Sequence, residues 1–323
     1  MVSIEEKFMV NILYRSESKI LNGIDISTIN FENLIKLASS HLMLPALYFN
    51  INKKNCSYLF PDDFIEYIKN IFAINKARNT VLLAEAKELS ELLYKNNINH
   101  IFLKGTALLL TNVFEDIGER MIGDIDFIIQ HKNEEKVIKL LNQHNYFGSS
   151  PERYQTLFKI FKPKHIPRFI NENKIMALEL HTELLTPGWR NVFNSKKLIS
   201  TLKDKVKIIK TPNKPFLFDH CIYALQLEDQ RIFNSLHSHR SIYDIYKLDC
   251  KKSLTIKNIT KDIYIKHFFL TINKFKIFEI HITSSTMNSY FDKSFLIVRK
   301  FSTNVARYIL KKILVNISRQ IKL

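Results

Sequence analysis

The sequence predicts an α+β fold, because helical and strand-like patterns occupy separate parts of the chain. Residues 1–95 read as helical, and the clearest helix carries an apolar residue at every third or fourth position: Leu82, Ala86, Leu89 and Leu93. Short apolar runs bounded by glycine or asparagine, which are typical of strands, follow between residues 101 and 184. Helical patterns return after residue 215. We therefore expect a small sheet between helical N-terminal and C-terminal regions.

The middle of the chain alternates strand and helix signals, and glycine and asparagine mark the loops between them. The expected elements, in chain order, are a strand at 101–103, a helix at 107–114, a strand at 124–129, a helix at 134–144 and a hairpin with arms at 165–170 and 175–184. Two further helices are expected between residues 216 and 248.

A chain of 323 residues is long enough for about two domains and for a substantial core. The best linker candidate is 211–215, which contains two prolines and an asparagine. We expect three regions: an N-terminal helical region at 1–95, a central region at 96–210, and a C-terminal helical region with a basic tail at 211–323.

The composition argues against several classes of protein. Hydrophobic residues make up 46% and aromatic residues 12% of the chain, which is not the composition of a disordered protein. No apolar run approaches the ~18 residues of a membrane-spanning helix, and the N-terminus lacks the pattern of a signal peptide. The three isolated cysteines, Cys56, Cys221 and Cys250, exclude a disulfide framework and a cysteine zinc site, so we expect a protein of the reducing cytoplasm.

The formal charge is +17, and most of it lies near the C-terminus. Residues 251–323 contain 15 basic and 3 acidic side chains, which supply 12 of the 17 excess charges. Within this tail, one face of an expected helix is apolar and the other faces are basic. The apolar residues are Val298, Phe301, Val305, Ile309 and Ile313, and the basic residues are Arg299, Lys300, Arg307, Lys311 and Lys312. Such a helix packs on its own domain, lies on an anionic membrane surface or binds RNA, so contact with a polyanion is one expected role of the tail.

Glycine is scarce, and half of it is clustered. The chain has six glycines, of which Gly105, Gly118 and Gly123 fall within nineteen positions. A chain that otherwise avoids glycine and gathers it in one place is expected to need an unusual backbone there.

Acidic residues on the expected strands form a candidate site. Side chains alternate between the two faces of a strand, so Asp124 and Asp126 share a face, as do Glu179 and His181. Two adjacent carboxylates raise each other's pKa unless a cation lies between them, and Mg²⁺ suits such oxygen ligands. If the second hairpin arm pairs beside the strand that carries the two aspartates, Glu179 completes a group of three carboxylates.

The turn around Gly105 has the features of a phosphate site. Backbone N–H groups at the start of a helix that follows a glycine suit an anion, and Thr106 adds a hydroxyl and Lys104 a positive charge. Arg120, four residues before Asp124, is placed to bridge two phosphate oxygens. Each feature alone has an ordinary explanation, such as a solvated acid pair or a surface arginine. Together, a phosphate cradle and metal carboxylates indicate phosphoryl or nucleotidyl transfer with one or two magnesium ions.

Three segments in this order carry a family resemblance: Leu103-Lys104-Gly105, then Arg120-x-x-Gly123-Asp124-Ile125-Asp126, then Glu179-Leu180-His181. They resemble the uncharacterised bacterial nucleotidyltransferase family of the polymerase-beta-like superfamily, over roughly residues 30–250. The resemblance implies that the core is a small mixed sheet with flanking helices.

The resemblance also implies roles for single residues. Asp124 and Asp126 would bind magnesium, and Glu179 would be the third metal carboxylate or the general base. Gly105 and Thr106 would hold the triphosphate. The full set expected to bind nucleotide or phosphate is Lys104, Gly105, Thr106, Arg120 and His181.

The leading prediction is a magnesium-dependent nucleotidyltransferase that moves a nucleoside monophosphate from a nucleoside triphosphate to an acceptor and releases pyrophosphate. The fold class does not choose among RNA, a protein and a small molecule as the acceptor. Two alternatives stay open: a non-catalytic nucleic-acid-binding protein on a transferase fold, and a tRNA-modifying toxin of a toxin–antitoxin pair. Four polar residues either frame the nucleotide or acceptor or form a solvated helix face: His237, His239, Arg240 and Asp244.

Overall fold

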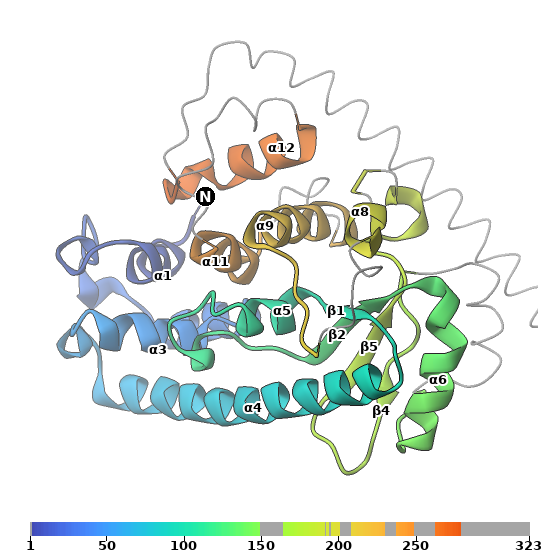
Figure 1. The fold of residues 1–323 in the computed structure, drawn as a ribbon. Helices are drawn as coiled ribbons and strands as arrows, with labels where there is room; N and C mark the ends of the chain where they lie inside the picture. The colour runs from blue at the N-terminus through green and yellow to red at the C-terminus, as the bar shows by residue number, and fades with distance from the viewer. Residues whose placement is uncertain are drawn as a thin grey trace, which may run out of the picture.

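A computed structural model describes residues 2–148, 164–190, 192–193, 195–200, 208–229, 237–248 and 262–278. Over these ranges the chain forms helices and a five-stranded mixed sheet, so the predicted α+β fold class is confirmed (Figure 1). No helix within them is both long enough and apolar enough to cross a bilayer. The amphipathic helix expected at 298–313 lies outside the described residues.

Helices fill the N-terminal region, as its apolar periodicity predicts. They are α1 (Ile4–Tyr14), α2 (Phe31–Ser40), α3 (Leu44–Lys53) and the 34-residue α4 (Asp62–Lys95). Ser3 and Asn30 cap α1 and α2, because their side-chain oxygens accept backbone N–H groups of the first turn. The predicted apolar stripe of α4 is buried at every position. This helix runs beneath α3 and α5 (Lys104–Leu110) as far as the sheet (Figure 1).

The sheet has the strand order β1-β2-β5-β4-β3. Its strands are β1 (His100–Phe102), β2 (Asp124–Ile129), β3 (Phe147–Gly148), β4 (Phe169–Ile170) and β5 (Ala177–His181). β2 and β5 are parallel, and the other neighbours are antiparallel. The predicted hairpin is present, but its paired strands are shorter than the predicted arms, and its turn is closed by a hydrogen bond from the Lys174 N–H to the Asn171 carbonyl.

Two helices, α5 (Lys104–Leu110) and α6 (Glu134–Gln143), connect the strands. The prediction for the first was wrong at both ends, because the helix begins before Ala107 and ends before Phe114. Its end coincides with Asn112, whose φ of 51° takes the backbone out of the right-handed helical region.

Helices also make up the described parts of the C-terminal region. They are α9 (Lys214–Tyr223) followed by a π-helical turn (Ala224–Glu228), α11 (His239–Lys247) and α12 (Ile263–Ile272). The short helix α8 (Ser195–Ser200) comes before them, within the central region. The linker predicted at 211–215 was too long. The Asn213 side chain accepts the N–H of Phe216 and caps α9, so Lys214 and Pro215 already belong to the helix.

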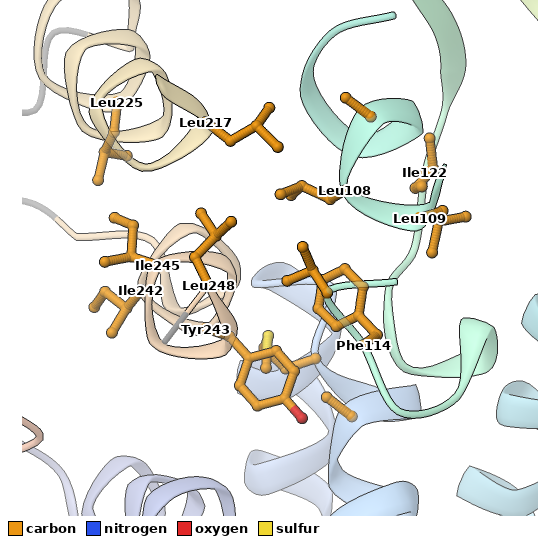
Figure 2. Packing of buried hydrophobic residues seen from close by; sticks show 14 of the residues in the cluster. Leu108, Leu109, Phe114, Ile122, Leu217, Leu225, Ile242, Tyr243, Ile245 and Leu248 are labelled. Atoms are coloured by element: carbon orange, nitrogen blue, oxygen red, sulfur yellow. The ribbon is translucent and has the colours of Figure 1, made fainter. Parts of the chain in front are cut away.

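Most buried apolar side chains belong to one cluster, which extends from Phe8 in α1 to Phe275 after α12. Figure 2 shows the part of this cluster where α5 meets α9 and α11. Phe114, which follows α5, stacks on Tyr243 of α11 with ring centroids 6.3 Å apart. This shared core packs the C-terminal helices against the region that carries the sheet. The division into 1–95, 96–210 and 211–323 stays a prediction.

The two faces of the sheet have different neighbours. The odd-numbered residues of β2 pack in the main cluster. On the other face, Ile128 joins a smaller cluster around Trp189. Because side chains alternate along a strand, Asp124 and Asp126 lie on this second face. The candidate carboxylates therefore lie at the start of a strand whose remaining side chains are buried on both faces.

Candidate active site

The carboxylates predicted on two strands lie side by side. In the parallel pairing of β2 with β5, Asp126 is the direct partner of Glu179. Asp124 precedes Asp126 by two residues and shares its face. Asp126 and Glu179 are almost fully buried, with 2% and 6% of their surfaces exposed. The expected pairing of the two strands, on which the carboxylate group depends, is therefore present.

Lys104 joins the two buried carboxylates. Its Nζ lies 2.6 Å from Oδ1 of Asp126 and 2.9 Å from Oε2 of Glu179. Nε2 of His181 reaches the same two oxygens at 2.8 and 3.1 Å. Asp126, Glu179 and His181 offer ligand atoms that lie within 4.8 Å of one another. An ammonium and an imidazole thus share the carboxylate oxygens that a divalent cation would use.

Two residues that sequence reasoning missed complete this group of charges. Nη2 of Arg168 lies 2.8 Å from Oδ2 of Asp124, and its Nε lies 3.7 Å from Oε1 of Glu179. Nδ1 of His165 lies 3.7 Å from the same glutamate oxygen. A signal for both was available, because they lie in the first arm of the predicted hairpin, whose second arm carries Glu179, and residues across a hairpin form charge pairs.

The electrostatics of this group favour one more cation. Burial raises the pKa of Asp124, and the nearby carboxylates of Asp126 and Glu179 raise it further. Lys104 and Arg168 offset only part of this effect. Burial also disfavours the charged form of Glu179, but hydrogen bonds and the Lys104 ammonium outweigh it and hold the pKa of that carboxyl well below its usual range. Asp124 is therefore the carboxylate whose charged form a further cation would stabilise, although Arg168 already pairs with it.

Burial holds two imidazoles near His181 neutral. Burial lowers the pKa of His165, although the Glu179 carboxylate opposes this. Burial lowers the pKa of His220 to about 3, and the Lys104 ammonium lowers it too. Both rings are therefore uncharged at pH 7, and Nδ1 of the neutral His165 ring lies 3.7 Å from the Glu179 carboxylate.

The unusual backbone predicted for the glycine cluster lies on a lysine instead. Gly105, Gly118 and Gly123 do not have a positive φ, whereas Lys104 has a φ of 47°. This region costs a non-glycine residue about 1–2 kcal/mol, and such strain is concentrated at functional sites. Gly105 is needed for space, because a Cβ there would lie 3.0 Å from the side chain of Ile122. The unusual backbone predicted for the glycines is therefore not on them. Close packing explains Gly105, whereas a Cβ at Gly123 would meet nothing within 4 Å.

The first turn of α5 lies against the start of β2. Thr106 is fully buried, and its hydroxyl donates to the backbone carbonyl of Asp124 at 3.3 Å. The Leu103 N–H donates to the carbonyl of Asp126 at 2.9 Å. The N–H groups of a first helical turn have no acceptor within the helix. This turn therefore presents backbone donors next to the carboxylates.

The loop between α5 and β2 is held from α4. Nδ2 of Asn75 donates to the carbonyl of Gly118 at 2.8 Å, and Nδ2 of Asn79 donates to that of Arg120 at 2.7 Å. Gly118 packs so closely on Phe72 that a Cβ would lie 2.7 Å from the ring. Because the loop leads directly into β2, these contacts position the aspartates.

Arg120 is paired with Asp244 of α11. Its Nε and Nη2 lie 2.6 and 2.8 Å from the two carboxylate oxygens, and the residues are only 8% and 4% exposed. This bidentate pair uses the donors that the sequence assigned to phosphate oxygens. A phosphate role for Arg120 stays a prediction, and it requires the Arg120–Asp244 pair to open.

Arg240 of α11 lies near the same group. Burial lowers the pKa of Arg240, and both Arg120 and Asp124 lie close enough to influence that pKa.

The carboxylate oxygens of Asp126 and Glu179 suit a magnesium ion, and Asp124 shares their face of the sheet. Asp124, Asp126 and Glu179 carry three negative charges, against two positive charges on Lys104 and Arg168. Magnesium prefers oxygen ligands, so the imidazole of His181 suits a hydrogen-bonding role better than a ligand role.

Comparison with protein-family models gives one match. A model described as an uncharacterised nucleotidyltransferase matches residues 27–251. The resemblance identified from the sequence over roughly residues 30–250 is therefore confirmed. The matched range includes the three carboxylates, Lys104 and the Arg120–Asp244 pair. Comparisons with curated proteins and with solved structures give no match.

Proposed function

Because this chain belongs to the uncharacterised nucleotidyltransferase family, we propose that it moves a nucleoside monophosphate from a nucleoside triphosphate to an acceptor hydroxyl, with release of pyrophosphate and dependence on magnesium. The observation that carries the proposal is the in-register pairing of Asp126 with Glu179, with Asp124 on the same face. Clustered buried acids are costly to a protein that only binds nucleic acid, because they repel phosphate.

Three carboxylates and a lysine form the centre of the proposed site. Asp124, Asp126 and Glu179 would hold one or two magnesium ions, which supply a Lewis acid that withdraws charge from the phosphates. The carboxylates oppose the effect of burial and raise the pKa of Lys104, so its ammonium stays charged and holds the carboxylate oxygens of Asp126 and Glu179 in place.

The triphosphate lies against the first turn of α5 in this proposal. Backbone N–H groups of Gly105 and Thr106 and the Lys104 ammonium contact phosphate oxygens. Arg168 is the arginine best suited to bridge them, because its side chain is 58% exposed and an exposed ion pair is weak enough to exchange partners. Arg120 positions the loop through its buried pair.

Transfer forms a bond between the acceptor oxygen and the α-phosphorus and breaks the bond from the α-phosphorus to the pyrophosphate oxygen. The acceptor must also lose a proton. Glu179 is a weak base, since its pKa is held well below the usual range, and this favours its role as the third metal carboxylate. His165, a neutral imidazole 3.7 Å from Glu179, is the better placed proton acceptor.

A labelling experiment tests the proposal. Purified protein is incubated with each of the four nucleoside triphosphates labelled at the α-phosphate, with magnesium and with bacterial extract, and RNA, protein and small molecules are then separated. We expect label from one or more triphosphates in one fraction, which identifies the acceptor class, and pyrophosphate in equal amount. RNA binding without transfer from any triphosphate would instead support the non-catalytic alternative.

A further inference from the structure

A second group of potential metal ligands consists of residues that the proposed transfer does not use. Glu6 lies in the first turn of α1, whereas His237 and His239 lie at the start of α11, 231 and 233 residues further along the chain. These three residues are called the imidazole–carboxylate cluster below.

The three side chains converge on one point. Nε2 of His237 lies 2.6 Å and Nε2 of His239 lies 3.0 Å from the same oxygen, Oε1 of Glu6. One ligand atom from each residue lies within 4.8 Å of the other two. The His239 side chain is fully buried, while 14% of His237 and 13% of Glu6 are exposed. The cluster is therefore preformed and reaches solvent at one edge.

Neighbouring rings hold the imidazoles in place. The ring of His41, which follows α2, lies 4.8 Å from the ring of His239 and 5.9 Å from that of His237. The ring of Phe275 lies 5.2 and 4.8 Å from the same two rings. Nδ1 of His41 accepts the main-chain N–H of His239 at 3.5 Å, so His41 belongs to the wall of the cluster. Side chains already fixed in this way lose little freedom when they bind an ion.

We propose that this cluster is a zinc site, with Nε2 of His237, Nε2 of His239 and the Glu6 carboxylate as ligands and water in the fourth position. Two imidazoles and one carboxylate suit zinc, whereas magnesium and calcium prefer oxygen alone. In a tetrahedral site with Zn–N distances of about 2.0–2.1 Å, ligand atoms lie about 3.3 Å apart. Each imidazole nitrogen reaches this spacing from the glutamate oxygen by moving away from it by less than about 1 Å.

Charge pairing alone explains less of this arrangement. One imidazolium is enough to neutralise one carboxylate, so an ion pair does not require a second buried imidazole on the same oxygen. A zinc ion uses both nitrogens and links α1 to α11. Because α11 also carries Asp244, which holds Arg120, the ion acts as a structural link between the N-terminal helix and the helix that positions the loop before β2.

Zinc and cobalt titrations test the proposal. Protein stripped with a chelator is titrated with Zn²⁺ by calorimetry and with Co²⁺, whose visible absorption reports tetrahedral coordination. The carboxylate group of the proposed active site is a second set of possible ligands, so the titration is repeated on the Asp126→Asn/Glu179→Gln double variant. We expect one zinc equivalent and a tetrahedral cobalt spectrum to persist in that variant.

Single variants identify the ligands. Glu6→Gln and His239→Gln should each weaken zinc binding by at least about 100-fold and remove the zinc-dependent rise in Tm. His131→Gln is the matched control. His131 lies in the turn before α6 and is paired with Glu134 of that helix at 2.7 Å. The His131→Gln protein should bind zinc as the wild type does. Unchanged affinity in the two ligand variants overturns the proposal. The Asp126→Asn/Glu179→Gln protein keeps all three proposed zinc ligands. Loss of the zinc equivalent from this protein would therefore also overturn the proposal.

Discussion

Oδ1 of Asp126 is shared between Lys104 and His181, so a change at this one residue alters several charged side chains. Asp126→Asn keeps the shape of the side chain but offers a poor ligand for a hard cation and a weaker acceptor for the lysine. We expect magnesium-dependent transfer to fall at least about 100-fold, since stabilisation by the metal is worth several kcal/mol. Label transferred per minute measures the loss. The matched control is Asp62→Asn at the exposed start of α4, and a near wild-type rate in Asp126→Asn would refute the metal assignment.

The charge of Asp124 destabilises the folded protein. Its pKa is raised in the folded protein, so the folded state binds more protons than the unfolded state and ionisation destabilises the fold. Asp124→Asn should therefore abolish transfer but raise the Tm at pH 7. The gain should disappear below about pH 4, where the carboxyl is protonated in both states. Thermal melts of the wild type and of Asp124→Asn between about pH 4 and pH 7 measure the difference in Tm. A Tm of Asp124→Asn at pH 7 below that of the wild type would contradict the expectation.

Glu179 is expected to act on turnover. Its oxygens contact Lys104 and His181, and Glu179→Gln removes the charge that these contacts share. We expect kcat to fall at least about 10-fold with a smaller change in the KM for the nucleoside triphosphate, because the charge acts most strongly in the transition state. If Glu179 and His181 act together, His181→Ala should likewise lower kcat more than it changes KM. A wild-type rate in His181→Ala would give that histidine a purely structural role, and a raised KM alone in Glu179→Gln would make the glutamate a binding residue.

At the scale of elements, the loop before β2 is held by two helices that are distant in the sequence. Asn75 and Asn79 of α4 bind its carbonyls, and Asp244 of α11 binds Arg120 within it. Lys247 of α11 adds an ion pair with Glu119, at 2.9 Å. The start of the strand that carries the aspartates thus depends on the packing of both helices.

Breaking the buried pair in this loop should be costly. Asp244→Asn leaves the Arg120 guanidinium buried without its countercharge, which we expect to lower the free energy of unfolding by about 3–5 kcal/mol. Urea denaturation measures the change. The matched control is Glu32→Gln, which breaks an exposed pair with Lys36 on α2 and should change stability by less than about 1 kcal/mol. Equal losses in the two variants would mean that burial does not decide the strength of the Arg120 pair.

For the whole molecule, charge divides the chain. Most of the basic excess lies after residue 250, whereas the proposed chemistry lies before it. The basic residues of the tail helix lie outside the described residues, so their role is a prediction from the sequence. A basic tail on a chain with a proposed nucleotide site favours an RNA contact over a membrane contact.

Neutralising the tail tests this contact. Replacing Arg307, Lys311 and Lys312 together by alanine should weaken RNA binding and reduce its salt dependence by up to about three phosphate contacts. Hydrolysis of, or self-labelling with, the nucleoside triphosphate should not change. The matched control replaces three exposed lysines of α4, at positions 69, 87 and 95. An unchanged salt dependence in the tail variant would exclude the tail from RNA binding.

The sequence by itself determined what depends on neighbours along the chain. The bounds of β2 follow from its alternation, and the same alternation predicted that Asp124 and Asp126 share one face of their strand and that Glu179 and His181 share one face of theirs. The buried stripe of α4 follows from the helical period in the same way. The segments that carry the family resemblance are local too, and they were enough to identify it.

Only the tertiary structure decided which charges meet. Arg168 reaches Asp124 because the segment before β4 returns beside β5, and Arg120 meets Asp244 across 124 residues. The left-handed backbone of Lys104 was also unforeseen, since local sequence favours glycine for that conformation. Local periodicity determines which face of an element a side chain occupies. The partner that the side chain meets on that face depends on how distant elements pack. Burial makes a charge without a partner costly, so this packing must bring opposite charges together.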